Sequence, residues 1–315
     1  KDYLTGNAPP EWIPLRPPSF YEELKIDLRL STNVSKIDPK QRAVTTASGE
    51  TFAYDALLLA TGAAPIRIPG FDHPKVQVLR TLRDSTALIE AAGKAKRAVM
   101  IGAGFIGLEA AASLCKRDID VSVVTPDALP LEKALGPEVA RFVLETHKAN
   151  GVHFHLGKGA KSFDGRKVLL DDGATLEADL VVLGVGVRPN VDLAKAAGLT
   201  VSNGVEVDAH LRTSDPTIFA AGDIANFPDA LSGERARVEH WVVAEQQGQI
   251  AAINMLGGAE RYDATPFFWS AHFEHTLNYV GYAPHWNRVE IDGSIAAHDF
   301  TARYFKDDRL LAACS

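Results

Sequence analysis

The sequence has few cysteines and no long uninterrupted apolar run. Its 315 residues include two cysteines, Cys115 and Cys314, which form neither a Cys-x-x-Cys pair nor a metal-ligand spacing. A disulfide framework is therefore not supported, and a reducing, cytoplasmic compartment is the default expectation. Even the apolar run at 178–187 is too short for the roughly 18 to 20 residues of a membrane-spanning helix. The sequence thus predicts no membrane span.

Blocks of positive charge are also missing. The formal net charge is -7, the sequence pI is about 5.8, and no Lys/Arg block is longer than the one at 94–97. This charge balance argues against nucleic acid as a partner. Hydrophobic residues make up 46% of the chain, which is enough for a large core, and the length indicates about two domains. Small ligands and protein partners are expected instead.

A glycine-rich turn lies within residues 98–109, which read AVMIGAGFIGLE. An apolar run precedes the glycines, apolar residues follow at helical spacing, and a second apolar run comes next, which is the pattern of a βαβ unit. In such a unit Gly102 permits the tight turn, Gly104 lets a pyrophosphate approach the backbone, and Gly107 packs the helix against the strand. The sequence therefore predicts a dinucleotide site, and the same turn includes Phe105 and Ile106.

The second strand of this unit ends without the usual acidic residue. NAD sites commonly place a carboxylate about 20 residues after the glycines, where it binds the ribose hydroxyls. Thr125 occupies this place, and Asp127 is the nearest acid. No Arg or Lys lies between Ile119 and Lys133 to bind the 2′-phosphate of NADPH. NADH is therefore favoured over NADPH, with Asp127 either a ribose ligand or a solvated loop acid.

An internal repeat relates two parts of the chain. Residues 49–65, GETFAYDALLLATGAAP, align without a gap with residues 173–189, GATLEADLVVLGVGVRP, at a constant separation of 124 positions. The repeat predicts two copies of one nucleotide-binding module. The same separation places the glycine turn of the first copy about 22 residues before Lys1. We therefore expect a chain that is truncated at its N-terminus, and its end inside an apparent strand indicates a clipped C-terminus.

Further motifs resemble those of a known family. Residues 60–62 (ATG) follow a buried strand, and residues 213–223 (TSDPTIFAAGD) end a short apolar strand in Gly-Asp. Together with the repeat, they resemble the FAD-dependent pyridine nucleotide-disulfide oxidoreductases, over nearly the whole chain. Within that superfamily, the ferredoxin reductase and apoptosis-inducing-factor-like group is similar in its short motifs, which here are KDYL at 1–4, EHW at 239–241, PFFWS at 266–270 and NYVGY at 278–282.

The resemblance implies an α/β fold with two duplicated Rossmann-like domains, one for FAD and one for NAD, and a small α+β C-terminal domain. The expected boundaries are 1–85 and 209–258 for the FAD domain, 86–208 for the NAD(H) domain and 259–315 for the interface domain.

The implied activity is hydride transfer from NADH to FAD, followed by single-electron transfer to an iron–sulfur protein of the ferredoxin or Rieske type. The chain holds no iron–sulfur ligand set, so that centre must lie on a partner or a fused domain. His153 and His155 are interpreted as a solvated pair and not as metal ligands. The protein is expected to be a monomer or a homodimer.

Roles for single residues also come from the resemblance. Glu109 is expected to face the nicotinamide and to pair with Lys1 beside flavin N5; a solvated acid favoured by the helix dipole is the alternative. Asp223 is expected to hold the ribitol, and the helix after His240 to stabilise the negative charge of reduced flavin. Trp269 is a candidate wall beside the flavin ring or a core aromatic residue. The complete set of expected cofactor-binding residues is Ala60, Thr61, Gly62, Gly102, Gly104, Phe105, Ile106, Gly107, Asp127, Gly184, Val185, Gly186, Gly222, Asp223, Glu239, His240, Trp241 and Trp269.

Two other classes of function stay open. One is an NADH oxidase or peroxidase that uses a cysteine upstream of this chain. The other is an apoptosis-inducing-factor-like flavoprotein in which NADH mainly shifts conformation and turnover is small.

Overall fold

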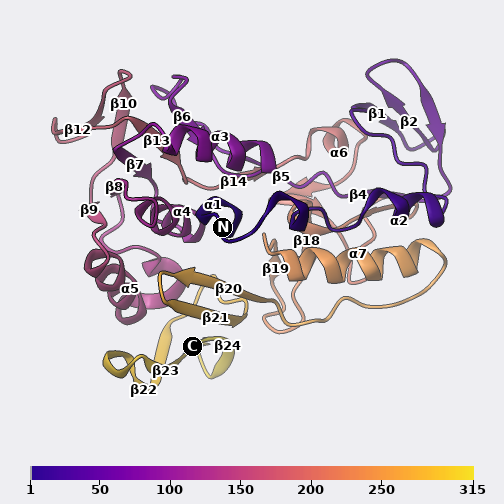
Figure 1. Cartoon of the computed structure of the whole chain (residues 1–315). Helices are drawn as coiled ribbons and strands as arrows, with labels where there is room; N and C mark the ends of the chain where they lie inside the picture. The colour runs from indigo at the N-terminus through magenta and orange to yellow at the C-terminus, as the bar shows by residue number, and fades with distance from the viewer. Residues whose placement is uncertain (1) are drawn as a thin grey trace.

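The computed structural model describes residues 2–315. Two α/β halves lie side by side, and a C-terminal sheet lies beneath the half that holds the glycine turn (Figure 1). None of the described helices combines the length and the apolar character that a membrane crossing requires.

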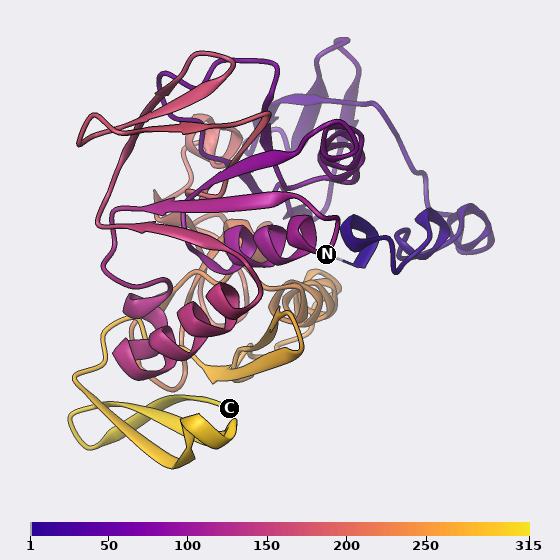
Figure 2. The ribbon, with the colours of Figure 1, turned by 60° about the vertical axis from the view of Figure 1, so that its left-hand side comes forward.

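The half with the glycine turn is built on a parallel sheet of five strands in the order β6-β13-β7-β8-β9 (Figure 2). Its central strands are buried on both faces, as expected of a parallel sheet covered by helices. The strands are β6 (Val76–Val78), β7 (Arg97–Ile101), β8 (Asp120–Thr125), β9 (His153–Leu156) and β13 (Leu180–Leu183), and the helices are α3 (Leu82–Ala92), α4 (Phe105–Cys115) and α5 (Glu132–Ala149).

The internal repeat is visible in the strand pairing. A three-stranded antiparallel sheet precedes the last strand of each copy, and it pairs Ala43 with Ala53 in the first copy and Lys167 with Glu177 in the second. Both partners are shifted by the same 124 positions, so the two registers are equivalent. The strands are β1 (Val34–Asp38), β2 (Ala43–Thr46) and β3 (Thr51–Ala53) in one copy, and β10 (Ala160–Phe163), β11 (Lys167–Leu170) and β12 (Thr175–Glu177) in the other.

The two copies meet through one short strand from each. Strand β5 (Ala63–Pro65) pairs antiparallel with β14 (Val187–Pro189). Thr61 and Asn190 flank this joint: the Thr61 hydroxyl donates to the Asn190 carbonyl at 2.9 Å, and the Asn190 side-chain amide donates to the Thr61 carbonyl at 2.8 Å. The joint therefore fixes the carboxyl ends of β4 (Leu57–Leu59) and β13 beside each other.

The first copy is less complete than the second in the part of the chain that is described. Strand β4 (Leu57–Leu59) pairs in parallel with β17 (Ile218–Ala220), and within residues 2–315 no strand pairs with its other edge. Helix α7 (Trp241–Met255) packs on this pair. The remaining elements of this half and of the N-terminal segment are α1 (Asp2–Thr5), the 3-10 turn Pro10–Trp12, α2 (Pro18–Glu23), α6 (Asp192–Ala196), β15 (Val201–Ser202), β16 (Gly204–Glu206), the 3-10 turn Gly222–Ile224, β18 (Ala225–Pro228) and β19 (Arg235–Ala236).

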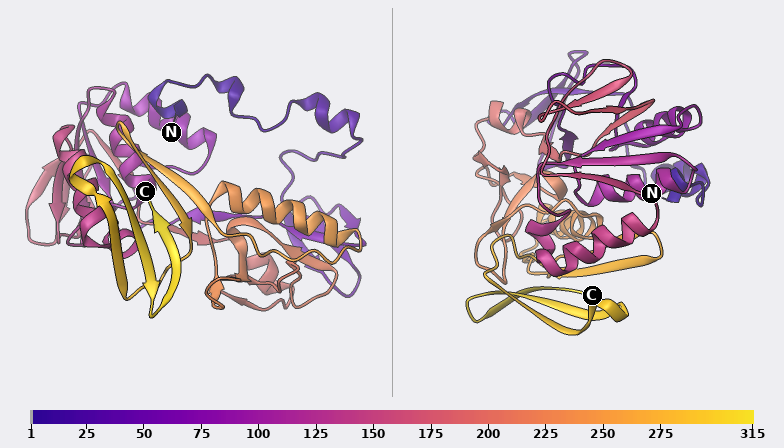
Figure 3. Two further views of the ribbon diagram at one scale, coloured as in Figure 1. Left: turned by 90° about the horizontal axis from the view of Figure 1, so that it is seen from below. Right: turned by 90° about the vertical axis from the view of Figure 1, so that its left-hand side faces the viewer.

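The C-terminal region is an antiparallel sheet in the order β20-β21-β24-β23-β22 (Figure 3). Residues 259–315 contribute one 3-10 turn, Ile295–Ala297, to this region. The helices that pack on the sheet are α4 and α5 of the neighbouring half, which contact β20. The Tyr304 hydroxyl donates to the carbonyl of Leu135 on α5 at 3.0 Å. The strands are β20 (Phe267–His272), β21 (His275–Gly281), β22 (Arg288–Ser294), β23 (Asp299–Lys306) and β24 (Arg309–Cys314).

Candidate functional site

The three glycines of the motif have different surroundings: Gly102 and Gly104 lie between β7 and α4, and Gly107 lies on the first turn of α4. Gly102 has φ +101, and a Cβ there would collide with the carbonyl of Gly184. A Cβ on Gly107 would lie 2.6 Å from the carbonyl oxygen of Gly102. A Cβ on Gly104 would meet no protein atom within 4 Å. Two of the glycines are therefore required by packing of the protein on itself, whereas Gly104 faces open space where a ligand has access.

The first turn of α4 is suited to an anion. Gly104 caps this helix and has no side chain to accept hydrogen bonds from the first backbone N–H groups. These groups and the helix dipole together favour a phosphate at this end. Phe105 and Ile106 follow directly; Ile106 is half exposed, and Phe105 packs edge-to-face on Phe268 of β20 at 5.0 Å between ring centroids. The glycine turn thus opens toward the C-terminal sheet.

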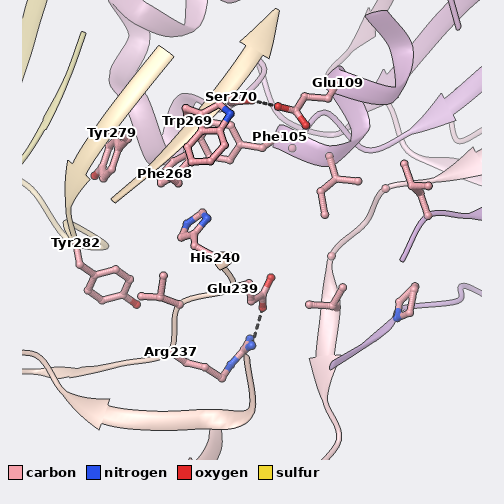
Figure 4. Close-up of a pocket in the computed structure, with 18 of the residues that line it drawn as sticks. Phe105, Glu109, Arg237, Glu239, His240, Phe268, Trp269, Ser270, Tyr279 and Tyr282 are labelled. Carbon is pink, nitrogen blue, oxygen red and sulfur yellow. Dashed lines mark hydrogen bonds and ion pairs between the residues drawn. The ribbon is translucent and has the colours of Figure 1, made fainter. Parts of the chain in front are cut away.

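A cavity of about 510 Å³ lies where the two halves and the C-terminal sheet meet (Figure 4). Aromatic side chains from β20 and β21 form one wall, and backbone from the glycine turn and from the end of β13 forms another. Of the residues expected from sequence, the cavity is lined by Gly104, Phe105, Ile106, Glu109, Gly184, Gly186, Glu239, His240 and Trp269.

Glu109 lies on the first turns of α4 at the edge of this cavity. One of its carboxylate oxygens accepts a hydrogen bond from the Ser270 hydroxyl at 2.9 Å and another from the N–H of Ala271 at 3.0 Å. Its orientation is therefore fixed by β20. The expected partner of Glu109, Lys1, lies outside the described residues, so that the pairing stays a prediction.

His240 and Glu239 line the opposite side of the cavity, at the start of α7. The His240 ring stacks on Phe268 with 4.0 Å between centroids and 6° between planes. Burial lowers the pKa of His240 to about 4, so the imidazole is neutral at physiological pH. Glu239 forms an ion pair with Arg237 at 2.6 Å (Figure 4). Because the guanidinium is almost fully buried, this pair holds Glu239 in place.

A second, smaller cavity of about 210 Å³ lies beside the carboxyl end of β4. The expected residues Ala60, Gly62, Gly222 and Asp223 line it, together with Arg80. The Arg80 guanidinium lies 2.5 Å from the Asp223 carboxylate. Asp223 is therefore held by a cation next to two glycines with positive φ, Gly62 at +64° and Gly222 at +76°.

The structure places other expected residues outside both cavities. Trp241 is 60% exposed and lines neither of them. The Thr61 hydroxyl donates its hydrogen bond to the Asn190 carbonyl at the joint between the copies. Val185 packs against the core on one face of the parallel sheet. Asp127 lies in the loop after β8, where Lys133 is its ion-pair partner at 2.7 Å. The binding roles of these four residues remain predictions.

Sequence reasoning missed several residues at the site. Arg80 and Arg237 pair with the expected acids, and Phe268, Tyr279 and Tyr282 line the larger cavity. The last two belong to the NYVGY motif, which served only for family assignment. Arg80 meets Asp223 only through a contact 143 positions apart in sequence, and Arg237, two positions before Glu239, belongs to no motif that indicates the pair. In the described part of the chain, no group of three His, Cys, Asp or Glu side chains is arranged to hold a metal ion.

Comparisons of the sequence and of the fold with known proteins identify the family of this chain. Residues 7–248 match the family described as pyridine nucleotide-disulphide oxidoreductase. Putidaredoxin reductase of Pseudomonas putida is 36% identical over 99% of this chain and 77% of that protein. Apoptosis-inducing factor 3 of Mus musculus is 32% identical over 98% of this chain and 53% of that protein. The crystal structure of the covalent putidaredoxin reductase–putidaredoxin complex superposes with a TM-score of 0.96 at 35% identity, covering 100% of this chain and 78% of that one. The chain belongs to the pyridine nucleotide-disulphide oxidoreductase family, and its relatives include ferredoxin reductases and apoptosis-inducing-factor-like proteins.

Proposed function

We propose that this chain transfers a hydride from a reduced nicotinamide nucleotide to FAD and delivers the electrons to an iron–sulfur protein. The larger cavity carries this proposal, because Gly104 of the glycine turn, Gly186 of the repeat and His240 at the start of α7 all line it. A nicotinamide extending from the glycine turn and a flavin ring lying at α7 would meet in this space. Relatives named putidaredoxin reductase and rhodocoxin reductase support the same activity for this chain.

The residues of the first copy fit the sugar and phosphate parts of FAD. Gly62 and Gly222 add no side chain of their own to the smaller cavity, Asp223 offers an acceptor for ribitol hydroxyls, and Arg80 offers a guanidinium for a phosphate. At α7, His240 makes no side-chain hydrogen bond to the first-turn N–H groups. Those groups can therefore face the anionic edge of a reduced flavin ring.

Bound FAD would supply a hydride acceptor that can release its two electrons one at a time. The protein's own residues would bind and orient the nicotinamide and the flavin and would exclude water from the space between them. Phe105 and Phe268 form an apolar wall, and Glu109, fixed by Ser270, faces the place proposed for the nicotinamide amide. His240 is neutral at physiological pH, so the N-terminus of α7, and not the imidazole, supplies positive potential at this position.

NADH is proposed as the preferred nucleotide, and a ferredoxin-type protein as the electron acceptor. Asp127 supports the first choice, because it follows the second strand of the βαβ unit, where a carboxylate binds the ribose hydroxyls. The similarity to a reductase solved in complex with putidaredoxin supports the second.

A thiol-based oxidase or peroxidase is less well supported. Within residues 2–315 no cysteine lines either cavity. Burial raises the pKa of Cys115 to about 11 and that of Cys314 to about 12, so neither is a thiolate at neutral pH. Peroxide reduction would therefore need a cysteine from outside this chain.

Anaerobic stopped-flow mixing of the FAD-loaded full-length protein with NADH tests the proposal. Fast loss of flavin absorbance, followed by fast recovery on adding a ferredoxin such as putidaredoxin, is the expected result. Slow loss with a persistent charge-transfer band would instead favour NADH sensing. Recovery with peroxide and not with ferredoxin would favour a peroxidase.

A further inference from the structure

Arg237 lies between the two cavities. It follows β19 and precedes the residues at the start of α7 that line the larger cavity. Its side chain is only 9% exposed, although the guanidinium carries a full positive charge. A buried guanidinium is stable only when it is paired and hydrogen-bonded. The partners of Arg237 therefore identify the groups that it holds in place.

The first partner is the loop that carries the expected ribitol acid. Nη1 of Arg237 donates to the backbone carbonyl of Asp223 at 3.1 Å, while the carboxylate of Asp223 lies 2.5 Å from the Arg80 guanidinium. The N–H of the preceding residue, Gly222, donates to the Gln247 side chain on α7 at 2.8 Å. Asp223 is thus held at its side chain by Arg80 and at its backbone by Arg237.

The second partner belongs to the larger cavity. Nη1 of Arg237 also lies 2.6 Å from one carboxylate oxygen of Glu239 (Figure 4). The Glu239 side chain is 35% exposed and lines the larger cavity together with His240. One guanidinium nitrogen therefore connects the two cavities, because it bonds to the backbone of the smaller one and to an acid of the larger one.

The hairpin between β15 and β16 fixes the position of Arg237 itself. The Asn203 side-chain oxygen accepts a hydrogen bond from Nε of Arg237 at 3.1 Å. The next residue, Gly204, has φ +112, and a Cβ there would lie 3.0 Å from Cδ of Arg237. The glycine thus lets the hairpin pack against the stem of the arginine. With Nε and Nη1 both bonded, the planar guanidinium keeps one orientation, which a flexible ammonium would not keep.

We infer that Arg237 is a positioning residue shared by the two cofactor sites. Through the Asp223 backbone it supports the binding of FAD, and through Glu239 it orients the nicotinamide for hydride transfer. Hydride transfer requires the two reacting atoms to be near contact and aligned, so a loss of orientation lowers the rate. This inference rests on the proposed function, because it requires the ribitol of FAD in the smaller cavity and the nicotinamide in the larger one.

Arg237→Gln tests this role in the full-length protein by two measurements. The dissociation constant for FAD, from absorbance titration of deflavinated protein, is expected to rise about tenfold, because the Asp223 backbone loses a charge-assisted hydrogen bond. In FAD-saturated protein, the limiting rate of flavin reduction at saturating NADH is expected to fall about tenfold, because Glu239 loses its orientation. The NADH concentration at half this limiting rate should change less than about twofold, since the glycine turn still binds the pyrophosphate.

Arg235→Gln is the matched control. Arg235 lies two positions earlier and donates to the carbonyls of Val207 at 2.9 Å and Asn226 at 2.6 Å. It also lies 4.0 Å from the Glu206 carboxylate, and it lines neither cavity. The same kinds of partner are therefore lost in the same half of the protein, and both measurements should change less than about twofold. Equal effects of the two substitutions would mean that Arg237 supports only the fold, and would overturn the proposal.

A double-mutant cycle with Glu239→Gln separates the two routes. Glu239→Gln alone is expected to slow flavin reduction about tenfold and to change the FAD dissociation constant less than about twofold. Adding Arg237→Gln should slow reduction no further, yet should still raise the FAD dissociation constant.

Additive losses of rate in this cycle would show that Arg237 does not act through Glu239, and would overturn the proposal. An unchanged FAD dissociation constant in Arg237→Gln would overturn it too. Failure of the proposed function has a different signature, because NADH would then not reduce the flavin of the unsubstituted protein.

Discussion

Glu109 and Ser270 are joined by a hydrogen bond across the boundary between the nucleotide-binding half and the C-terminal sheet. The Ser270 hydroxyl donates to the Glu109 carboxylate at 2.9 Å, and the neighbouring N–H of Ala271 donates to the same oxygen. The acid at the cavity edge is therefore oriented by a strand that lies 161 positions later in the chain. The C-terminal sheet thus takes part in building the site and does more than cover it.

Substitution of Glu109 is expected to slow flavin reduction while leaving the stability of the fold unchanged. Glu109→Gln keeps the size of the side chain, so the fold should persist, but flavin reduction by NADH should slow about ten- to hundredfold because the nicotinamide is less well placed. The measurement is anaerobic stopped flow with FAD-loaded protein. Ser113→Ala is the control, because the Ser113 hydroxyl donates to the backbone carbonyl of Glu109 at 2.7 Å. A wild-type rate in Glu109→Gln would show that this acid has no role in hydride transfer.

Gly104→Ala and Gly102→Ala are expected to behave differently. The backbone at Gly104 has φ -78 and space for a Cβ, so alanine should leave the melting temperature almost unchanged while weakening NADH binding about tenfold, because the methyl group takes the place of the pyrophosphate. Gly102→Ala should cost about 2 kcal/mol of stability or more, since φ is +101. Thermal unfolding and fluorescence titration measure the two effects. Normal NADH affinity in Gly104→Ala would mean that the pyrophosphate lies elsewhere.

Arg80→Gln is expected to weaken FAD binding. It removes the guanidinium that lies 2.5 Å from Asp223 and lines the smaller cavity. In the full-length holoprotein, loss of a charge-assisted contact of this kind should raise the dissociation constant for FAD about tenfold. Absorbance titration of deflavinated protein gives this constant. Arg83→Gln removes an exposed arginine three positions later, on α3, and should have no effect. Equal FAD affinity in the two variants would exclude Arg80 from the flavin site.

Acid is expected to destabilise the fold through a buried histidine pair. His147 on α5 and His272 on β20 lie 3.0 Å apart between ring nitrogens, and burial lowers the pKa of His147 from 6.5 to about 3. Above pH 6.5 neither the folded nor the unfolded state protonates His147. Between pH 6.5 and 3 the unfolded state binds the proton and the folded state does not, so the free energy of unfolding falls as the pH is lowered. His240, with a pKa of about 4, acts in the same direction.

Chemical denaturation at several pH values checks this prediction. The contribution of His147 is up to about 1.4 kcal/mol per pH unit within the window. His147→Phe should flatten the pH dependence below pH 6.5, whereas His285→Gln, which removes an exposed histidine, should leave it unchanged. An unaltered slope in His147→Phe would contradict the assigned pKa shift.

Local patterns predicted the strands, the glycine turn and the repeat, because these depend on residues that are close in sequence. The apolar run expected before the glycines is β7 (Arg97–Ile101), and the helix expected after His240 is α7 (Trp241–Met255). The C-terminal region was expected to be α+β, and the helices that cover its sheet are α4 and α5 of the neighbouring half. No local pattern indicates that these two helices pack on that sheet. Arg80 was missed for the same reason, because it meets Asp223 only after a long-range contact of the fold has formed.

The joint between β5 and β14 has a further consequence. Ala63 pairs with Pro189 while Pro65 pairs with Val187, and each strand is the repeat equivalent of the other. The flanking bonds follow the same rule: the N–H of Ile66 donates to the carbonyl of Gly186 at 3.0 Å, and the N–H of Asn190 donates to the carbonyl of Gly62 at 2.9 Å. Reciprocal contacts of this kind are the mark of an isologous, two-fold interface. Within a single polypeptide the two copies therefore meet as two identical subunits of a symmetric dimer would, so one chain carries both sides of a self-complementary contact.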